Sequence, residues 1–424
     1  MRRAVSILLL SVALAAAAGG PASAAGNEIL RKARARQAEA AAAEARAREK
    51  AQAADRRAVQ GYRNALRANP KDAAAMVGLG DACAAGRGVA KDEAEAVAWY
   101  RKAAELGNPD GRYALASRYA SGRGVEQDYA ESLRWARLAA DQGHPPSESL
   151  LGLLHERGMG VPKDEAQALS WYRRAAEGGD VASQKLLAYR CLEGQGVPKD
   201  AAAAAAWYRR AAEAGDADAQ TRLAAMYRGG VGVPKDDAEA YRWYSRGADG
   251  GNAEAFAGLG GMLLYGRGTP PDPEAAAAWI LKASDRGIPE GVFLQGVLYT
   301  YGRAVPQDDG ESLSLFLRAA EEGYVDAQLQ LAKMYLEGSG VPKNDNEAAA
   351  WYRRAAEGGN AEAQAMLGWM HETGRGVPKD PGEAEGWFCL AAAQGNAVAR
   401  EHLRHLGAVS CTPGKRPETG PAGR

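Results

Sequence analysis

The nine letters WYRRAAEGG stand at residues 171–179 and recur unchanged at residues 351–359. An identical nonapeptide so far along one chain indicates an internal repeat. Tryptophan marks the period, because it recurs every 36 residues and Leu315 fills the single gap in register. The marker tryptophans are Trp99, Trp135, Trp171, Trp207, Trp243, Trp279, Trp351 and Trp387.

Nine repeats follow one another over residues 72–395 without insertion or deletion. Each has the pattern of two short helices. In the last repeat, "NAEAQAMLGWMHET" is the first, "GRGVPKD" a loop and "PGEAEGWFCLAAAQG" the second. Glycine closes every repeat, as expected where a helix ends in a left-handed residue. One helix pair cannot bury enough apolar surface alone, so the repeats must stack. The sequence therefore predicts an all-α solenoid.

Small residues recur at the ninth position of every repeat, which predicts close approach of two helices there. Tryptophan or its substitute then fills the space between layers. The ninth residues are Gly80, Ala116, Gly152, Ala188, Ala224, Gly260, Gly296, Ala332 and Gly368.

The shared motif resembles the Sel1-like repeat, a relative of the tetratricopeptide repeat. The resemblance covers about three quarters of the chain, with local departures at Leu263, Gln295 and Leu315. It implies a right-handed superhelix with the first helices on its concave face, and roles in signalling, envelope assembly or host interaction. In the eighth repeat it rests on Ala327, Leu331, Tyr335, Gly338, Gly340, Val341, Ala348, Trp351, Tyr352, Ala355, Ala356 and Gly359.

The segments outside the repeats have distinct compositions. Residues 1–24 have the charged start, apolar stretch and small-residue cleavage site of an export signal, which predicts a periplasmic or secreted protein. Residues 25–53 are rich in Ala, Arg and Glu and should be helical. Residues 54–71 resemble the second helix of a tetratricopeptide unit and predict an N-terminal cap. At the other end we expect a capping helix at 396–407 and a disordered tail at 408–424.

The charge balance argues against nucleic acid as a partner. The 53 Lys and Arg residues equal the 53 Asp and Glu residues, so the formal net charge is zero. No later stretch is apolar enough for a membrane helix, so the mature chain should have no transmembrane segment. The oligomeric state stays open.

The histidines and two of the cysteines at repeat positions are explained by packing. Cys83, His155, Cys191 and His371 occupy the twelfth position of their repeats, which a packing tyrosine usually fills. Cys83 and Cys191 lie three layers apart, too far for a disulfide. Cys389 and Cys411 can pair in the oxidising compartment that export implies. Two free thiols remain the alternative.

Motifs for catalysis, cofactors and metals are missing. "HERGM" and "HETGR" lack the second histidine of a zinc protease, and the G-x-G loops join two helices instead of following a strand. S-x-x-K and K-T-G, which β-lactam-binding enzymes carry, do not occur. We therefore predict no catalytic residue, no cofactor and no metal site.

A variable stripe is the candidate binding surface. Positions six, ten, thirteen and fourteen lie opposite the core positions of the first helix. On this stripe Phe293, Val297 and Tyr301 should form an apolar strip with Leu264 and Tyr265 of the adjoining repeat. Burial of some of these residues by a tightly curled superhelix is the alternative. Two further aromatic residues share the stripe, Tyr189 and Trp369.

These observations favour a non-enzymatic scaffold or adaptor of the bacterial cell envelope, which binds a protein or peptide in the concave groove. Two alternatives belong to other classes. One is a hydrolase or binder of cell-wall or β-lactam-like substrates, and the other is a spacer tethered through its N-terminal helix.

Overall fold

A computed structural model describes residues 46–406. The predicted export signal, most of the predicted 25–53 segment, the predicted tail and Cys411 lie outside this range. The described chain consists of twenty helices and contains no strand, which confirms the all-α repeat prediction. Within residues 46–406, no helix combines the length and apolarity needed to cross a membrane.

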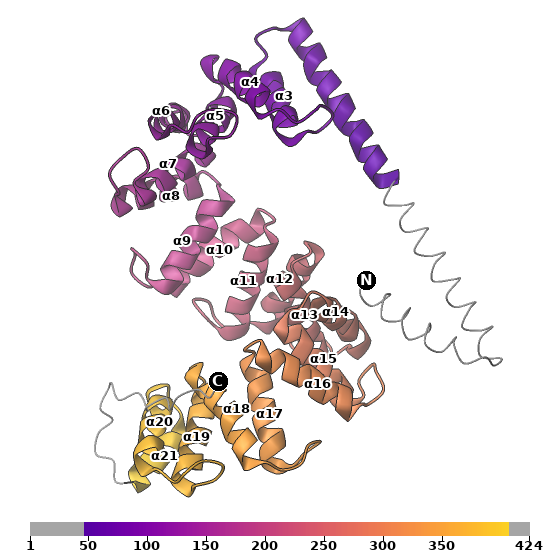
Figure 1. The fold of residues 1–424 in the computed structure, drawn as a ribbon, viewed down its shortest axis with the longest axis vertical. Coiled ribbons are helices and arrows are strands. Elements are labelled where there is room, and N and C mark those ends of the chain that lie inside the picture. The colour runs from indigo at the N-terminus through magenta and orange to yellow at the C-terminus, as the bar shows by residue number, and fades with distance from the viewer. Residues whose placement is uncertain (1–45, 407–424) are drawn as a thin grey trace, which may run out of the picture. The chain divides into compact units, whose positions relative to one another are not determined.

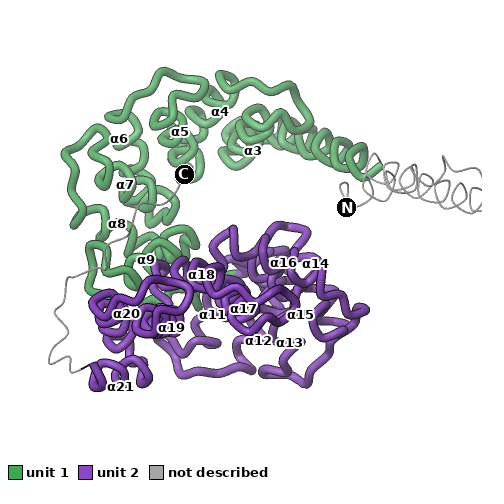
Figure 2. Tube along the Cα trace, turned by 60° about the horizontal axis from the view of Figure 1, so that its bottom comes forward, with its two compact units in different colours: residues 1–214 green, residues 215–424 purple. Residues whose placement is uncertain are grey.

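The chain divides into two compact units, residues 1–214 and 215–424 (Figure 2). The first described helix of unit 1 covers residues 46–68 and runs through the predicted boundary between residues 53 and 54. The other helices of unit 1 are α3 (Ala73–Ala85), α4 (Glu93–Glu105), α5 (Pro109–Ser121), α6 (Tyr129–Ala140), α7 (Pro145–Arg157), α8 (Glu165–Glu177), α9 (Val181–Glu193) and α10 (Ala201–Glu213) (Figure 1).

Unit 2 continues the same helix-pair pattern and closes with one shorter helix (Figure 1). Its helices are α11 (Ala217–Gly229), α12 (Asp237–Asp249), α13 (Ala253–Tyr265), α14 (Pro273–Asp285), α15 (Pro289–Tyr301), α16 (Asp309–Glu321), α17 (Val325–Glu337), α18 (Asp345–Glu357), α19 (Ala361–Thr373), α20 (Pro381–Ala393) and α21 (Ala397–His405).

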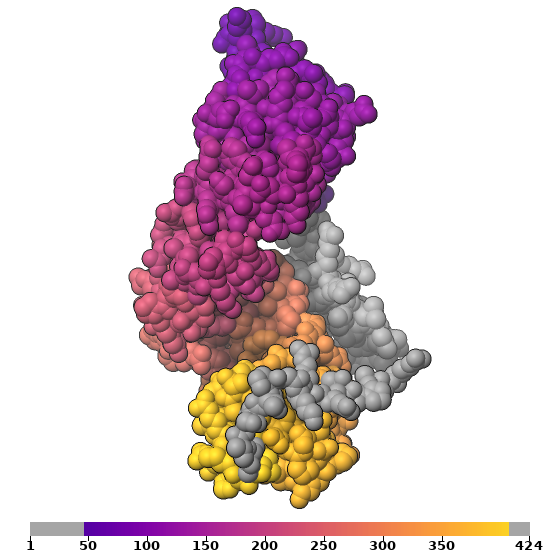
Figure 3. All heavy atoms as spheres, turned by 90° about the vertical axis from the view of Figure 1, so that its left-hand side faces the viewer, coloured from indigo at the N-terminus to yellow at the C-terminus, as the bar shows by residue number. Residues whose placement is uncertain are grey.

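We call the first helix of each repeat the A helix and the second the B helix. Each A helix packs on the B helix of its own repeat and, within a unit, every A helix after the first also packs on the B helix of the repeat before it. Figure 3 colours the atoms by residue number, and within each unit residues close in sequence lie together. The main helix contacts lie within one repeat or between neighbouring repeats, as in a stacked array.

Capping residues fix where the helices begin and end. Asp164 precedes α8 and its carboxylate accepts a hydrogen bond of 2.9 Å from the backbone N–H of Gln167. At the other end of an A helix, Gly158 follows α7 with φ of 67°, a left-handed conformation that glycine adopts without strain. These two signals recur through the chain, so helix lengths stay nearly constant.

The first four letters of WYRRAAEGG have separate packing roles. Trp171 lies under the guanidinium of Arg174, whose central carbon is 4.6 Å from the ring centroid, and Trp351 lies under Arg354 at 4.5 Å. Tyr172 is buried and faces the A helix of its own repeat, where its hydroxyl donates to Glu156 at 2.9 Å. The motif thus combines a tryptophan ring stacked under an arginine with a tyrosine ring in the core.

The two alanines of the motif join one repeat to the next. Ala175 and Ala176 are completely buried. The carbonyl of Ala176 accepts a hydrogen bond of 2.9 Å from the side-chain amide of Gln184, which belongs to the following repeat. The same bond joins Gln328 to Ala320 at 3.1 Å. A larger side chain at either alanine would separate the stacked helices.

The small ninth position is confirmed as a packing site. A Cβ atom added to Gly152 would lie 2.7 Å from the ring of Tyr172, and one added to Gly80 would lie 2.5 Å from the ring of Tyr100. In the fourth repeat Ala188 is completely buried at the same position. The A and B helices of a repeat can therefore approach only over Gly or Ala.

The predicted role of position twelve also holds. Cys83, His155 and His371 are buried and Cys191 is half-buried. The thiols of Cys83 and Cys191 are free. His371 keeps the polar contact of the tyrosine that it replaces, because Arg353 lies 3.3 Å from its Nε2 just as Arg101 donates to Tyr119 at 2.8 Å.

Replacing Gly152 with Leu should lower the stability of the array by about 1–3 kcal/mol, because the side chain must displace the Tyr172 ring. Thermal melting followed by circular dichroism measures this change. Gly152→Ala is the matched control and should melt between the wild type and the Leu variant, because its Cβ atom needs only a small shift of the Tyr172 ring, as in the repeats that carry alanine there. Equal melting of the Leu and Ala variants would contradict the packing assigned to position nine.

Acid should destabilise the protein through its two buried histidines. Burial, then nearby arginines, lower the pKa of His155 and of His371 below 6.5, so the unfolded chain takes up protons more readily. The contribution of these two histidines to the free energy of unfolding is fully present above pH 6.5. It is lost as the pH falls through their folded-state pKa values. The double variant His155→Tyr with His371→Tyr should show a smaller fall in melting temperature between about pH 7.5 and 5.5.

Candidate functional site

The predicted stripe divides into exposed and buried residues. Tyr189 and Tyr265 are each 49% exposed and Tyr301 is 66% exposed, while Phe293 and Trp369 are half-buried. Leu264 and Val297 are only 2% and 6% exposed, so their placement on an open strip is wrong. Helix α13 packs directly on α15, and this A-to-A contact covers part of the face that a single helix would leave open.

A cleft of about 320 Å³ opens on the A helices of unit 2. Its residues come from α11, α13, α15 and α17 and from the loop after α13, so four successive repeats build it. Tyr265 and Phe293 of the predicted strip are among them. The lining is Arg228, Gly261, Met262, Tyr265, Arg267, Glu290, Phe293, Leu294, Tyr324 and Asp326.

An ion pair closes one part of the cleft. Arg228 donates from Nη1 to Oε1 of Glu290 at 3.0 Å, and its guanidinium lies 5.5 Å from the centroid of the Tyr244 ring. Burial opposes the charge on Arg228, but Tyr244 and Glu290 outweigh it, so the pKa of the guanidinium is raised. The arginine is therefore a fixed cation that is already neutralised by Glu290.

Aromatic rings form the rest of the wall. The Phe293 ring lies 5.3 Å from that of Phe316 and 5.4 Å from that of Tyr324, centroid to centroid. The Tyr324 hydroxyl donates to Oδ2 of Asp326 at 3.3 Å. Tilted rings at these distances attract one another, so Phe293 and Tyr324 hold a defined apolar surface.

The tyrosines around the cleft keep their protons. Burial raises the pKa of Tyr244 to about 12. Burial, followed by Glu290 and Asp326, also raises the pKa of Tyr324 above its usual range. Such phenols donate hydrogen bonds and do not act as bases near neutral pH. The cleft is thus equipped to bind an apolar group beside hydrogen-bonding groups.

Three repeats depart from the pattern at their first position. His144 is in unit 1, Tyr324 lines this cleft, and Ile288 stands two residues before Glu290 of its lining. Tyr324 and Ile288 stand at the first position of their repeats, where most repeats carry Asp or Asn. Neither side chain makes a capping hydrogen bond, so α17 and α15 each lack a contact worth roughly 0.5–2 kcal/mol. Loss of local stabilising contacts beside a cleft is common at functional surfaces.

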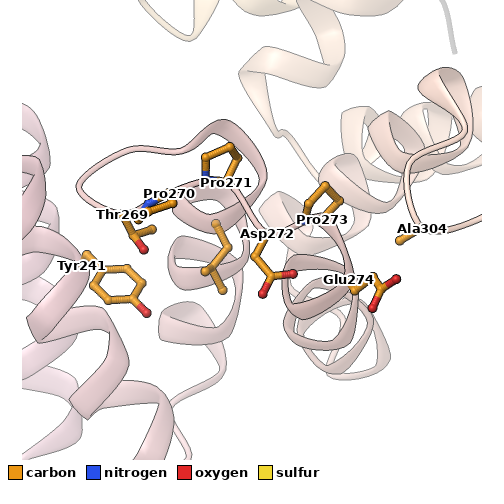
Figure 4. A pocket seen from close by; sticks show the side chains of 9 residues that line it. Tyr241, Thr269, Pro270, Pro271, Asp272, Pro273, Glu274 and Ala304 are labelled. Atoms are coloured by element: carbon orange, nitrogen blue, oxygen red, sulfur yellow. The ribbon is translucent and has the colours of Figure 1, made fainter.

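A second hollow of about 660 Å³ lies at the loop edge of unit 2 (Figure 4). Tyr241 stands on one side and Ala304 on the other, with loop prolines between them. The Asp272 carboxylate accepts the backbone N–H of Ala275 at 3.0 Å and so serves as the cap of α14. Its lining has no opposed charges, which makes the first cleft the stronger site.

Ala304 explains why this hollow exists. Other repeats have glycine at this place, and a Cβ atom on Gly124 or Gly376 would lie 2.1 Å or 2.0 Å from a carbonyl oxygen of the preceding B helix. Ala304 carries a Cβ atom and has φ of 58°. Its loop therefore cannot close in the same way on the start of α14, and the hollow lies between Ala304 and Pro273.

The repeats match a known family along the array. The Sel1 repeat family model matches nine consecutive stretches, residues 73–108, 109–144, 145–180, 181–216, 217–252, 253–288, 291–324, 325–360 and 361–396. The chain belongs to the Sel1 repeat family. Sel1 repeat proteins generally act as protein-interaction scaffolds without catalysis.

Two solved structures are similar to this Sel1 repeat protein over most of its length. One is c5321, a protective antigen present in uropathogenic Escherichia coli strains, with 32% identity, 82% of each chain covered and a TM-score of 0.57. The other is a Sel1 repeat protein from Oxalobacter formigenes, with 32% identity, 72% of this chain and 89% of that chain covered, and a TM-score of 0.52. Among curated proteins none matches this chain.

The sequence pattern indicated some of the residues that line the cleft and not the others. It singled out Tyr265 and Phe293, but not Arg228, Glu290 or Tyr324. The unusual residue at the first position of the eighth repeat was the available signal for Tyr324. The Arg228–Glu290 pair joins residues two repeats apart, and no sequence pattern indicated it.

The predicted pairing of Cys389 with Cys411 remains a prediction. Cys389 is half-buried beside the core cluster around Phe388, and it takes part in a disulfide. Cys411 lies outside the described residues.

Replacing Ala304 with Gly should stabilise the protein by about 0.5–1 kcal/mol, because glycine adopts the left-handed conformation without the Cβ penalty. Gly340→Ala is the reverse change at the equivalent loop position of the next repeat, where φ is 71° and the nearest atom to an added Cβ is 3.4 Å away. It should destabilise by about 1 kcal/mol. Chemical denaturation of both variants measures the effect, and shifts of the same sign would refute the assignment of strain.

Proposed function

We propose that this Sel1 repeat protein is a non-enzymatic scaffold or adaptor that binds a polypeptide on the A-helix face of unit 2. The cleft between Tyr265, Phe293 and Tyr324 is the anchoring point. One observation supports this above all: four successive repeats contribute to a single cleft with aromatic walls.

The size and lining of the cleft suit a side chain of a partner. Its volume of about 320 Å³ lies at the lower limit of sites that enclose small molecules, which run from about 300 to 1,000 Å³. Phe293 and Leu294 offer apolar surface, and the Tyr324–Asp326 pair lies beside them. An apolar or aromatic side chain inserted here would be oriented by polar groups at its edge.

Exposed rings extend the surface beyond the cleft. Tyr265 and Tyr301 are both exposed, at the ends of the adjacent helices α13 and α15. Tyrosine and arginine are enriched among residues that contribute most to protein interfaces. Tyrosine buries a large area with few rotatable bonds. The helices that carry them are packed on both sides, so the surface is preformed and its ordering costs little.

The cellular setting of this proposal rests on the sequence of residues 1–24. Their pattern of charge, apolar residues and a small-residue cleavage site supports export to the periplasm or beyond. We therefore place the scaffold in the bacterial envelope, where its partner would be another exported protein.

The double variant Tyr265→Ala with Tyr301→Ala should lose the partner, with an affinity at least about tenfold weaker, because two contact rings are removed. In-cell cross-linking, pull-down and mass spectrometry compare the variant with the wild type. Once a partner is known, calorimetry gives the affinity.

Leu281→Ala is the matched control, since Leu281 is an exposed apolar residue on the B helix α14 of the same unit. It should retain the partner. If the tyrosine variant kept every specific partner while circular dichroism showed it folded, this binding surface would be wrong.

A further inference from the structure

The tripeptide Tyr-Gly-Arg occurs twice in unit 2, at residues 265–267 and 301–303. In both copies the tyrosine ends an A helix and the arginine lies in the loop that follows. Each guanidinium lies over its own ring, Arg267 at 5.7 Å from the Tyr265 centroid and Arg303 at 5.5 Å from the Tyr301 centroid. We call these four residues the Tyr–Arg patch.

The four residues are within electrostatic range of one another. Burial raises the pKa of Tyr265, and Tyr301 raises it further, while Arg267 and Arg303 act in the opposite direction. Tyr265 and Arg267 also line the cleft. The patch is therefore one surface that continues the proposed binding site.

The two arginines of the patch lack the carboxylate partner that Arg375 has at the same loop position. In the ninth repeat Arg375 holds the same loop position and makes hydrogen bonds of 2.9 and 3.2 Å to the two carboxylate oxygens of Asp345, the first residue of α18. The corresponding first residue of α14 is Pro273, which offers Arg303 no carboxylate.

For Arg267 the corresponding residue is Asp237, but the two do not pair. Oδ1 of Asp237 is buried without a hydrogen-bond partner among the described residues. Over residues 46–406 neither Arg267 nor Arg303 makes an ion pair of 4.0 Å or less. Two guanidinium groups thus stand uncompensated in a protein whose net charge is zero.

The charges of the adjoining cleft do not cancel those of the patch. Arg228 and Glu290 neutralise each other at 3.0 Å. Asp326 remains, and its carboxylate accepts the Tyr324 hydroxyl. Besides the neutral pair, the lining holds the carboxylate of Asp326 and the guanidinium of Arg267, and Arg303 adds a second guanidinium next to this lining. The surface therefore favours a ligand with negative charge.

We propose that the Tyr–Arg patch binds an acidic segment of the partner polypeptide, with carboxylates on Arg267 and Arg303 and an adjacent aromatic side chain against Tyr265 and the cleft. This inference rests on the proposed function and specifies the chemistry of its partner. Guanidinium groups bind carboxylates through paired hydrogen bonds, and stacking on a tyrosine ring holds each one in place.

Fluorescence anisotropy with the full mature chain tests the proposal. The probe is a labelled eight-residue synthetic peptide with one phenylalanine flanked by two aspartates on each side. We expect it to bind the wild type and to bind the double variant Arg267→Gln with Arg303→Gln about tenfold or more weakly, with binding that weakens as salt rises.

The matched control removes the same charges from unit 1. Arg87 and Arg123 hold the same loop position in the first two repeats and are exposed. The variant Arg87→Gln with Arg123→Gln should bind the acidic peptide like the wild type. Equal losses in both double variants would mean a general charge effect and would overturn the proposal.

Two further probes separate the alternatives. An asparagine counterpart of the peptide that bound as tightly as the aspartate form would overturn the acidic partner. If binding of the asparagine peptide were still lost in the variant Tyr265→Ala with Tyr301→Ala, the proposed function would stand without the preference for an acidic partner. A single-stranded oligonucleotide of equal charge that bound more tightly than the peptide, through the same arginines, would replace the acidic polypeptide with nucleic acid.

Discussion

Each repeat depends on a side chain of the B helix that rests on a residue with almost no side chain. Gly152 beneath Tyr172, Gly80 beneath Tyr100 and Gly296 beneath Phe316 are three instances of this contact. The contact sets how closely the two helices of a pair approach. Because the same geometry returns in each repeat, the pairs can stack with buried alanines between them. The surface that we propose as the binding site is built on this regular frame.

The cleft and the hollow both arise where the frame is broken. Ile288 and Tyr324 replace capping residues, Pro273 replaces an acidic first residue, and Ala304 replaces a glycine. These substitutions fall in consecutive repeats of one unit, and each removes a local stabilising feature. In return the chain gains an aromatic wall at Tyr324 and, at position 303, an arginine without a carboxylate partner in the described part of the chain. A repeat protein acquires an individual surface in this way without altering its fold.

The net charge of the chain does not indicate the local charge of this surface. A formal net charge of zero indicates no strong preference for anions or cations. On the A-helix face of unit 2, however, the Arg228–Glu290 pair is internally neutral while Arg267 and Arg303 are not. Binding responds to charges within a Debye length of about 8–10 Å, so the local arrangement matters more than the total.

The sequence by itself determined the helix pairs, the nine repeats, the small ninth position and the packing role of position twelve, because each rests on contacts that recur at a fixed spacing. It also identified Tyr265, Phe293 and Tyr301. The tertiary structure alone decided that Leu264 and Val297 are buried, since the packing of α13 on α15 depends on how one repeat is rotated against the next. It likewise decided that Arg228 pairs with Glu290 and that, among residues 46–406, Arg303 pairs with no carboxylate. Such contacts join different repeats at single places, and a pattern that is read from periodicity cannot contain them.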